Sequence, residues 1–336
     1  MLARVAEALY WTARNLERAD DTGRMLELSH AFALDSSGDP AGPGVWMPAV
    51  IASGGAKVFT QNHLRASERS VVWFLTFSEI NPNSMRACTM RARANARGVR
   101  DALPPEVWEE INSLARAVGQ WTPRRLAHDG VFTLCRIMRR ALHQVEGAMD
   151  AEMRRDEAWH FLRIGRFLER ASTAARLLEA RWRIIGDRAI APGDRVAPDE
   201  WHALVGAAVA PAVMMAAAPG ALTAEAAVRL LVADERFPRS VRYSLDRVED
   251  SLLELEAMGA AGRRNTGRDL VAEARNRVYM LDPLPVGPDL TRFLDEIQER
   301  CNLIGTHIAS CFFDYRHEDP TGHDRQRPQA ARQAQN

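Results

Sequence analysis

One charged segment occurs twice in this chain, and this repeat constrains the fold more than any other feature. Residues 10–19 read YWTARNLERA, and residues 161–171 read FLRIGRFLERA. A shift of 152 positions superposes the Glu-Arg-Ala triplets at 17–19 and 169–171. Agreement of this kind indicates an internal duplication, so the architecture has to be explained from the repeated unit.

A second pair of segments supports the duplication. A shift of 156 positions aligns the Pro-x-Ser triplets at 82–84 and 238–240. In both copies the proline disfavours helix at the residue before it, and the serine can cap the helix that follows. The repeated unit is therefore about 150 residues long, and we expect two halves, at about 1–150 and about 153–317.

Helical periodicity runs through both halves, and no stretch alternates with the two-residue period and β-branched content of a strand. The sequence therefore predicts an all-α fold, a single pseudo-twofold helical bundle with essentially no β-sheet. We expect a first helix over about 2–32, and closing helices of the two halves over about 126–151 and 290–315. The helical domain spans 1–317, and a disordered polar tail follows over 318–336.

Apolar side chains flank the charges of the repeated helices. Tyr10 and Met25 lie on the side of the first helix that carries Glu17, and Leu162 and Leu177 do the same in the second copy. A helix that is apolar nearly all round is typical of a protein interior. Because burying an unpaired carboxylate costs several kcal/mol, the glutamates of both copies need arginine partners.

The duplication predicts that the two repeated helices face each other and exchange these partners. The expected pairs are Glu17 with Arg166 or Arg170, and Glu169 with Arg14 or Arg18. Arginine suits a buried pair because its planar guanidinium binds a carboxylate through two bonds and stays charged. The alternative is pairing within each helix, at three- or four-residue spacing on a solvated face.

A row of basic residues follows the first Pro-x-Ser triplet and supplies further candidate ligand-binding residues. The row consists of Arg86, Arg93, Arg97 and Arg100, with Ser84 at the start of the helix and Asn95 nearby. Arginines on one face of a helix can hold a carboxylate or a phosphate. The alternatives are a solvated face, or pairing with the Glu-rich segment 106–110.

Charge and composition exclude several classes of function. The formal net charge is zero, so no global field steers the protein to nucleic acid or to an anionic membrane. Four scattered cysteines without a Cys-x-x-Cys pair predict a reduced, cytoplasmic protein. The charged start is not a secretory signal, and the apolar run 203–218, expected as a buried helix pair, is too short to span a bilayer.

The sequence predicts neither a metal nor a cofactor. The nine histidines share no ligand spacing, and neither repeated glutamate is part of a Glu-x-x-His motif. No glycine-rich phosphate loop occurs, so the chain does not look like an ATP-binding component itself.

Taken together, these segments resemble the bacterial alpha-E family, an all-helical family named for its Glu-Arg motif. The resemblance covers nearly the whole chain and includes an Ala-Arg-x-Asn-Ala-Arg stretch at 92–97. It implies association with circularly permuted ATP-grasp ligases, and often with transglutaminase-like peptidases. Such sets of proteins resemble systems that build or remodel a peptide or an amide.

Three functions remain open from the sequence. The first is an accessory or binding component that partners an ATP-grasp ligase and binds an acidic peptide, a carboxylate or a phosphate. The second is an enzyme of amide or peptide modification, with Glu17 or Glu169 as general base. The third is an interaction scaffold with no chemistry of its own.

Overall fold

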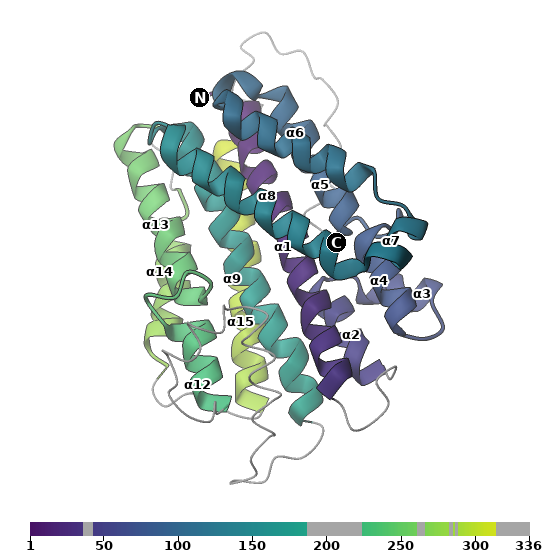
Figure 1. Cartoon of the computed structure of the whole chain (residues 1–336). Helices are drawn as coiled ribbons and strands as arrows, with labels where there is room; N and C mark the ends of the chain where they lie inside the picture. The colour runs from purple at the N-terminus through teal and green to yellow at the C-terminus, as the bar shows by residue number, and fades with distance from the viewer. Residues whose placement is uncertain (36–42, 187–223, 261–265, 282–284, 286–287, 314–336) are drawn as a thin grey trace.

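Every regular element that the structure describes is helical (Figure 1). The computed structural model describes residues 1–35, 43–186, 224–260, 266–281, 285 and 288–313. The helices are α1 (Ala3–Asp35), α2 (Pro43–Ala52), α3 (Ala56–Asn62), α4 (Glu68–Thr76), α5 (Met85–Gly98), α6 (Pro105–Gly119), α7 (Pro123–Asp129), α8 (Val131–Glu152), α9 (Glu157–Gly186), α12 (Ala224–Val228), α13 (Val241–Ala257), α14 (Arg268–Tyr279) and α15 (Pro288–Phe312). Two short turns, the 3₁₀ helix η1 (Arg100–Ala102) and the π-helix η2 (Arg229–Ala233), complete them. The predicted all-α fold is confirmed.

The two helices that carry the repeated segment, α1 and α9, pack against each other in the middle of the bundle (Figure 1). Helices α5 and α8 pack on α1, and α13 and α15 pack on α9. Tyr10, Met25, Leu162 and Leu177 are all buried. Both repeated helices are therefore internal, as their apolar content predicts.

A glycine sets how closely α1 and α9 approach. A Cβ atom built on Gly165 of α9 would lie 2.3 Å from the carbonyl oxygen of Tyr10 in α1. Only a residue without a side chain fits against this backbone, so the two helices come close enough for their charged turns to meet.

The two Pro-x-Ser triplets start corresponding helices. Ser84 caps α5 by accepting a hydrogen bond from the amide of Ala87 at 3.3 Å. Ser240 caps α13 in the same way, with the amide of Tyr243 at 2.9 Å. Helix α5 then packs on α1 and on α6, as α13 packs on α9 and on α14. This order of contacts is what a duplication predicts, and the duplication itself stays a prediction from the sequence.

The closing helix of the first half differs from the expectation. The sequence predicted one helix over about 126–151, whereas the structure has a break between α7 and α8 at Gly130. Gly130 has φ +76°, a backbone conformation that interrupts a helix and favours glycine. The apolar run 203–218 and the tail 318–336 lie outside the described residues.

Candidate functional site

Glu169 of α9 binds arginines of α1. Arg14 Nε donates to its Oε2 at 2.8 Å, and Arg18 donates from Nε and Nη2 at 2.7 and 2.9 Å. Arg176, from α9 itself, adds a bond of 3.3 Å. The Glu169 side chain is 0% exposed, so each carboxylate oxygen is buried and accepts two hydrogen bonds.

The pairing is reciprocal. Arg170 of α9 donates from Nε and Nη2 to Glu17 of α1, at 2.7 and 3.0 Å, and the Glu17 side chain is also 0% exposed. The predicted exchange between the two helices is confirmed, and a solvated face is excluded for both glutamates. Of the two arginines expected for Glu17, Arg170 is the partner, whereas Arg166 pairs with Glu146 of α8 at 3.3 Å.

These pairs determine the chemistry of both glutamates. Burial opposes ionisation of Glu169, but Arg18 and Arg14 outweigh it and hold the pKa of this carboxyl well below its usual range. Arg170 and Arg239 lower the pKa of Glu17 against the same effect of burial. A carboxylate with a lowered pKa is a weak base at neutral pH. The general-base alternative for Glu17 and Glu169 therefore gains no support from their surroundings.

Further ion pairs extend these motifs into one ionic core. In the part of the chain that the structure describes, its carboxylates are those of Glu17, Asp20, Asp21, Glu27, Glu146 and Glu169, and its guanidinium groups are those of Arg14, Arg18, Arg24, Arg139, Arg166, Arg170, Arg176 and Arg239. If all of them are ionised, positive charges exceed negative ones by two. A surplus of partly desolvated positive charge favours the binding of an anion.

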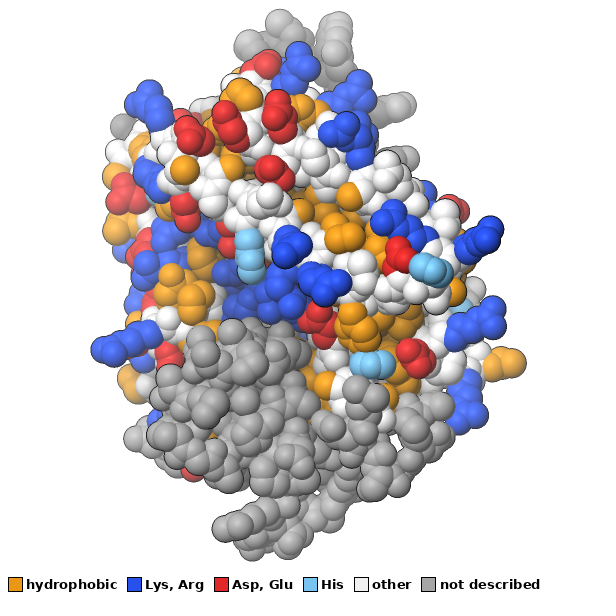
Figure 2. Space-filling view, viewed as in Figure 1, with side chains coloured by type: hydrophobic (Ala, Val, Ile, Leu, Met, Phe, Trp, Pro, Cys, Tyr) orange, Lys and Arg blue, Asp and Glu red, His pale blue; other side chains and the backbone are white. Residues whose placement is uncertain are grey.

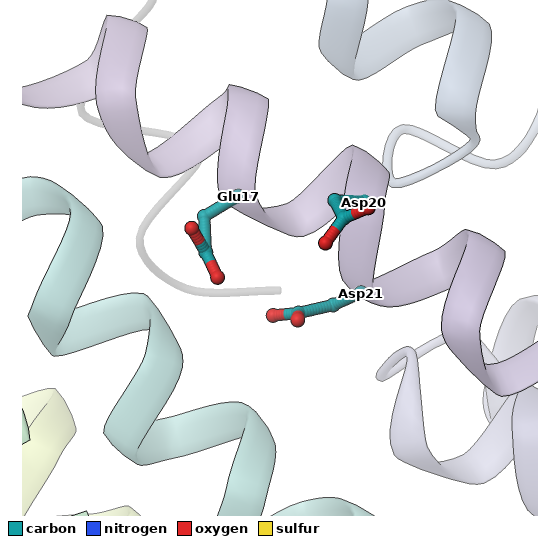
Figure 3. Close-up of side chains that lie close together, drawn as sticks. All are labelled: Glu17, Asp20 and Asp21. Atoms are coloured by element: carbon teal, nitrogen blue, oxygen red, sulfur yellow. The ribbon is translucent and has the colours of Figure 1, made fainter. Parts of the chain in front are cut away.

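Three of the carboxylates form a cluster on α1. Glu17, Asp20 and Asp21 bring oxygens within 4.8 Å of one another, and Glu17 and Asp21 point into the space beside the helix (Figure 3). Arg239 contacts all three, with Nη1 3.2 Å from Glu17 and 3.1 Å from Asp21, and Nη2 3.0 Å from Asp20. Arg24 Nε adds a bond of 2.7 Å to Asp20. A metal ion would have to displace these guanidinium groups, so the cluster fits arginine pairing better than metal binding.

Asp21 differs from its neighbours because only one of its oxygens is paired. Its Oδ1 accepts from Arg239, but its Oδ2 is buried and has no hydrogen-bond partner among the described residues. Burial and the neighbouring Glu17 raise the pKa of Asp21 to about 7. Its carboxyl group therefore changes charge near neutral pH, in the range useful for acid–base chemistry or ligand selection.

Asp21 lines a cleft between α1 and α9, in which polar and apolar side chains meet. The lining residues are Asp21, Arg24, Met25, Arg170, Thr173, Ala174, Leu177, Leu231 and Arg239. The cleft has a volume of about 30 Å³, room for about two water-sized groups. Lys and Arg side chains also gather near the middle of the molecular face in Figure 2.

The two copies of the repeat differ at this cleft. The shift of 152 positions places Asp20-Asp21 of α1 on Ser172-Thr173 of α9, so hydroxyl groups replace two carboxyl groups. The loops that face these turns differ as well. Arg239 faces the carboxylates of α1, whereas Asn83, its counterpart in the first half, accepts a bond of 3.0 Å from Arg18. The two added carboxyl groups of α1 thus face one added guanidinium group, that of Arg239.

A family model described as a predicted alpha-helical domain with a conserved ER motif matches residues 1–313. The chain belongs to the Alpha-E family. Its two Glu-Arg dipeptides, at 17–18 and 169–170, are the ones that face each other here. In this Alpha-E protein the glutamate of each dipeptide accepts hydrogen bonds from the arginine of the other.

Relatives of the chain occur among mycobacterial proteins. Uncharacterized proteins of Mycobacterium bovis and Mycobacterium tuberculosis are 25% identical to it over 280 residues. These matches cover 77% of this chain but 30% of each relative, so the chain spans about a third of their length. No solved structure matches it.

The arginine row of α5 does not line the cleft. Arg86 and Arg97 are exposed, Arg93 donates a hydrogen bond to a side chain of α6, and Asn95 is half-buried. Ser84 is buried as the cap of α5. None of these residues is among those that line the cleft, and their binding of an anion stays a prediction.

The site therefore contains both expected and unexpected residues. Of the arginines expected to bind a ligand, Arg170 lines the cleft, and Arg14 and Arg18 are occupied by Glu169. Sequence reasoning missed Asp21 and Arg239. The mismatch between the two copies of the repeat is the signal that could have found Asp21.

Among the described residues, no helix combines the length and the hydropathy that crossing a bilayer requires.

Proposed function

We propose that this Alpha-E protein is the binding component of a cytoplasmic system that forms or modifies a peptide or amide bond. It holds an acidic peptide, a carboxylate or a phosphate in the cleft between α1 and α9. It works with a circularly permuted ATP-grasp ligase, and a transglutaminase-like peptidase is a further partner.

The cleft supports this proposal because it lies at the edge of the described ionic core. Three arginines are among its lining residues, Arg24, Arg170 and Arg239. Guanidinium groups bind carboxylates and phosphates with charge and directed hydrogen bonds. This concentration of arginine beside an open space is the observation that carries the proposal.

The chemistry of the proposed partner agrees with such a ligand. A ligase that forms an amide needs a carboxylate as one of its substrates, and a protein that holds this carboxylate can raise its local concentration at the ligase. The fully paired Glu17 and Glu169 then have the role of a rigid support, since their oxygens are occupied by arginines.

Filling the cleft tests the binding of an anion without altering the ionic core. Ala174 lines the cleft and is half-buried, so Ala174→Leu places extra side-chain atoms in the space for the ligand. Calorimetric titration with isovalerate and with inorganic phosphate is expected to show binding to the wild type and at least about tenfold weaker binding to this variant.

The matched control is Ala148→Leu on α8, because Ala148 is also half-buried but does not line the cleft. It is expected to bind as the wild type does. A wild type that binds neither anion, or an Ala174→Leu variant that binds equally well, contradicts the proposed cleft.

The proposed partnership needs a separate test. The full chain is co-purified with an ATP-grasp ligase from the same genome, and products formed with ATP and mixed amino acids are identified by mass spectrometry. We expect a stable complex and an amide product that depends on both proteins. A ligase that neither binds the chain nor changes its product when the chain is added contradicts the partnership.

A further inference from the structure

Among the carboxylates of the described ionic core, only Asp21 has the following three properties together. It lines the cleft, its residue is 5% exposed, and its Oδ2 has no hydrogen-bond partner among the described residues. Its side chain projects from α1 into the space beside the helix (Figure 3). A buried polar atom left unpaired, in a residue that lines a cleft, is a position where a ligand can bond.

Charged groups from every side control the proton on Asp21. Glu17, Asp20 and Arg24 lie near it on α1, Arg170 lines the same cleft from α9, and Arg239 contacts it from the segment before α13. Burial and Glu17 favour the protonated form, and Arg239 favours the ionised form. Both forms are therefore accessible near neutral pH.

We propose that Asp21 selects a monocarboxylate with a small apolar substituent, and that binding of this ligand places a proton on Asp21. This inference rests on the proposed function, because it specifies the ligand class of the same cleft. Asp21 is the residue that determines specificity, whereas the surrounding arginines supply the charge that attracts the anion.

The charge of Asp21 determines whether a carboxylate can bind beside it. An ionised Asp21 repels a second carboxylate at hydrogen-bond distance, as in other carboxyl pairs that share a site. A protonated Asp21 instead donates its O–H to the ligand, and the pair shares one proton. The ligand enters as an anion, and the proton comes from the solvent when Asp21 was ionised before binding.

Thr173 supplies a second donor at the position that corresponds to Asp21 in the other copy. Its Oγ1 accepts a hydrogen bond from Arg176 at 3.0 Å, so its own hydrogen remains to donate. Protonated Asp21 and Thr173 thus present hydroxyl groups from the two repeated helices.

The lining favours a carboxylate with an apolar substituent over a phosphate. Met25, Ala174, Leu177 and Leu231 form the apolar part of the lining and fit a short aliphatic substituent. A phosphate dianion would in addition meet stronger repulsion from the carboxylates of α1.

The test measures proton uptake directly. The full-length wild type is titrated with isovalerate at about pH 6, 7 and 8, each in two buffers with different ionisation enthalpies. We expect uptake to rise toward one proton per ligand at about pH 8, and affinity to fall by up to about tenfold for each pH unit above 7. Inorganic phosphate is expected to bind more weakly, and methylammonium not at all.

Two variants assign the proton. Asp21→Asn cannot ionise, so its binding of isovalerate is expected to be independent of pH and free of proton uptake. Asp101→Asn is the matched control, because Asp101 is fully exposed on η1, and it is expected to behave as the wild type. If Asp21→Asn does not fold, Asp21→Thr, which introduces the residue of the other copy, replaces it, and the wild-type uptake remains measurable.

The outcomes separate this inference from the proposed function. A wild type that binds neither isovalerate nor phosphate overturns both. A wild type that binds isovalerate without proton uptake, or an Asp21→Asn variant with unchanged pH dependence, overturns the role of Asp21 alone. Preferred binding of phosphate overturns the ligand class, and binding of methylammonium with proton release identifies a cation site instead.

Discussion

At the scale of the residue, the ionic core contains two kinds of carboxyl group. Glu169 is buried with its oxygens saturated by arginines, whereas Asp21 is buried with one oxygen unpaired. The first kind stabilises the structure and is inert toward protons near neutral pH. The second kind is costly to ionise, so it is available for a function.

Removing the charge of Glu169 tests its structural role. Glu169→Gln leaves Arg14 and Arg18 buried with no compensating charge, and breaking a buried pair in this way costs about 3–5 kcal/mol of unfolding free energy. Urea denaturation measures the change. Glu109→Gln, at an exposed position of α6, is the control and should leave the unfolding free energy nearly unchanged. A Glu169→Gln variant as stable as this control contradicts the assignment.

The raised pKa of Asp21 predicts that the free energy of unfolding depends on pH. Its pKa is raised to about 7 in the folded protein, above the value of about 3.9 for an unfolded chain. The folded state therefore holds the proton more tightly, and this stabilisation is complete below about pH 4 and lost as the pH rises through about 7.

Asp21→Asn removes this loss. Its melting temperature should rise relative to the wild type between about pH 4 and pH 7, and the gain should level off above that range. Other groups titrate in both proteins, so the difference isolates Asp21. Thermal unfolding at about pH 5 and pH 8 measures it. A difference that stays constant or shrinks as the pH rises shows that Asp21 is ionised in the folded protein at all these values.

At the scale of the element, the close crossing of α1 and α9 brings the two motifs together. Gly165→Ala places a Cβ atom against the backbone of Tyr10, which cannot move without displacing α1. We expect a loss of about 1–3 kcal/mol of unfolding free energy, as for overpacked interiors. Gly147→Ala on α8 meets nothing within 4 Å and should instead stabilise by about 0.5–1 kcal/mol. Equal effects of both substitutions in urea denaturation would refute the close crossing.

Repeated segments made part of this arrangement predictable. The two Glu-Arg-Ala triplets, with apolar neighbours on all sides, predicted internal helices and the exchange of partners between them. The break at Gly130 was missed, because an isolated glycine within a helical pattern does not reveal its φ angle. The choice between Arg166 and Arg170 as partner of Glu17 also needed the position of Glu146 on α8.

The cleft itself was beyond reach from the sequence. Arg239 contacts Asp21 across 218 positions of the chain, from a segment that sequence reasoning treated as a helix start. The surroundings of Asp21, including its unpaired oxygen, depend on how α1, α9 and the segment before α13 are placed in the tertiary structure. Such a feature can be hypothesised from the mismatch with Ser172-Thr173, but its burial and its facing arginines come from tertiary structure alone.

At the scale of the whole molecule, the reciprocal pairs join the two halves of the Alpha-E domain. Each half supplies the carboxylate for an arginine of the other, so the two motifs are paired across the two halves. The ionic core is therefore a specific connection between halves, added to the hydrophobic burial that stabilises any helical bundle. The cleft at its edge depends on this connection for its shape and charge.

A double-mutant cycle on Glu17 and Arg170 tests this central claim most directly. Glu17→Gln, Arg170→Gln and the double variant are compared with the wild type by urea denaturation, alongside the same cycle on the exposed pair Glu296 and Arg277. We predict a coupling energy of about 2–3 kcal/mol for the buried pair and at most about 1 kcal/mol for the exposed one. Additive effects of Glu17→Gln and Arg170→Gln, within about 0.5 kcal/mol, would contradict the account.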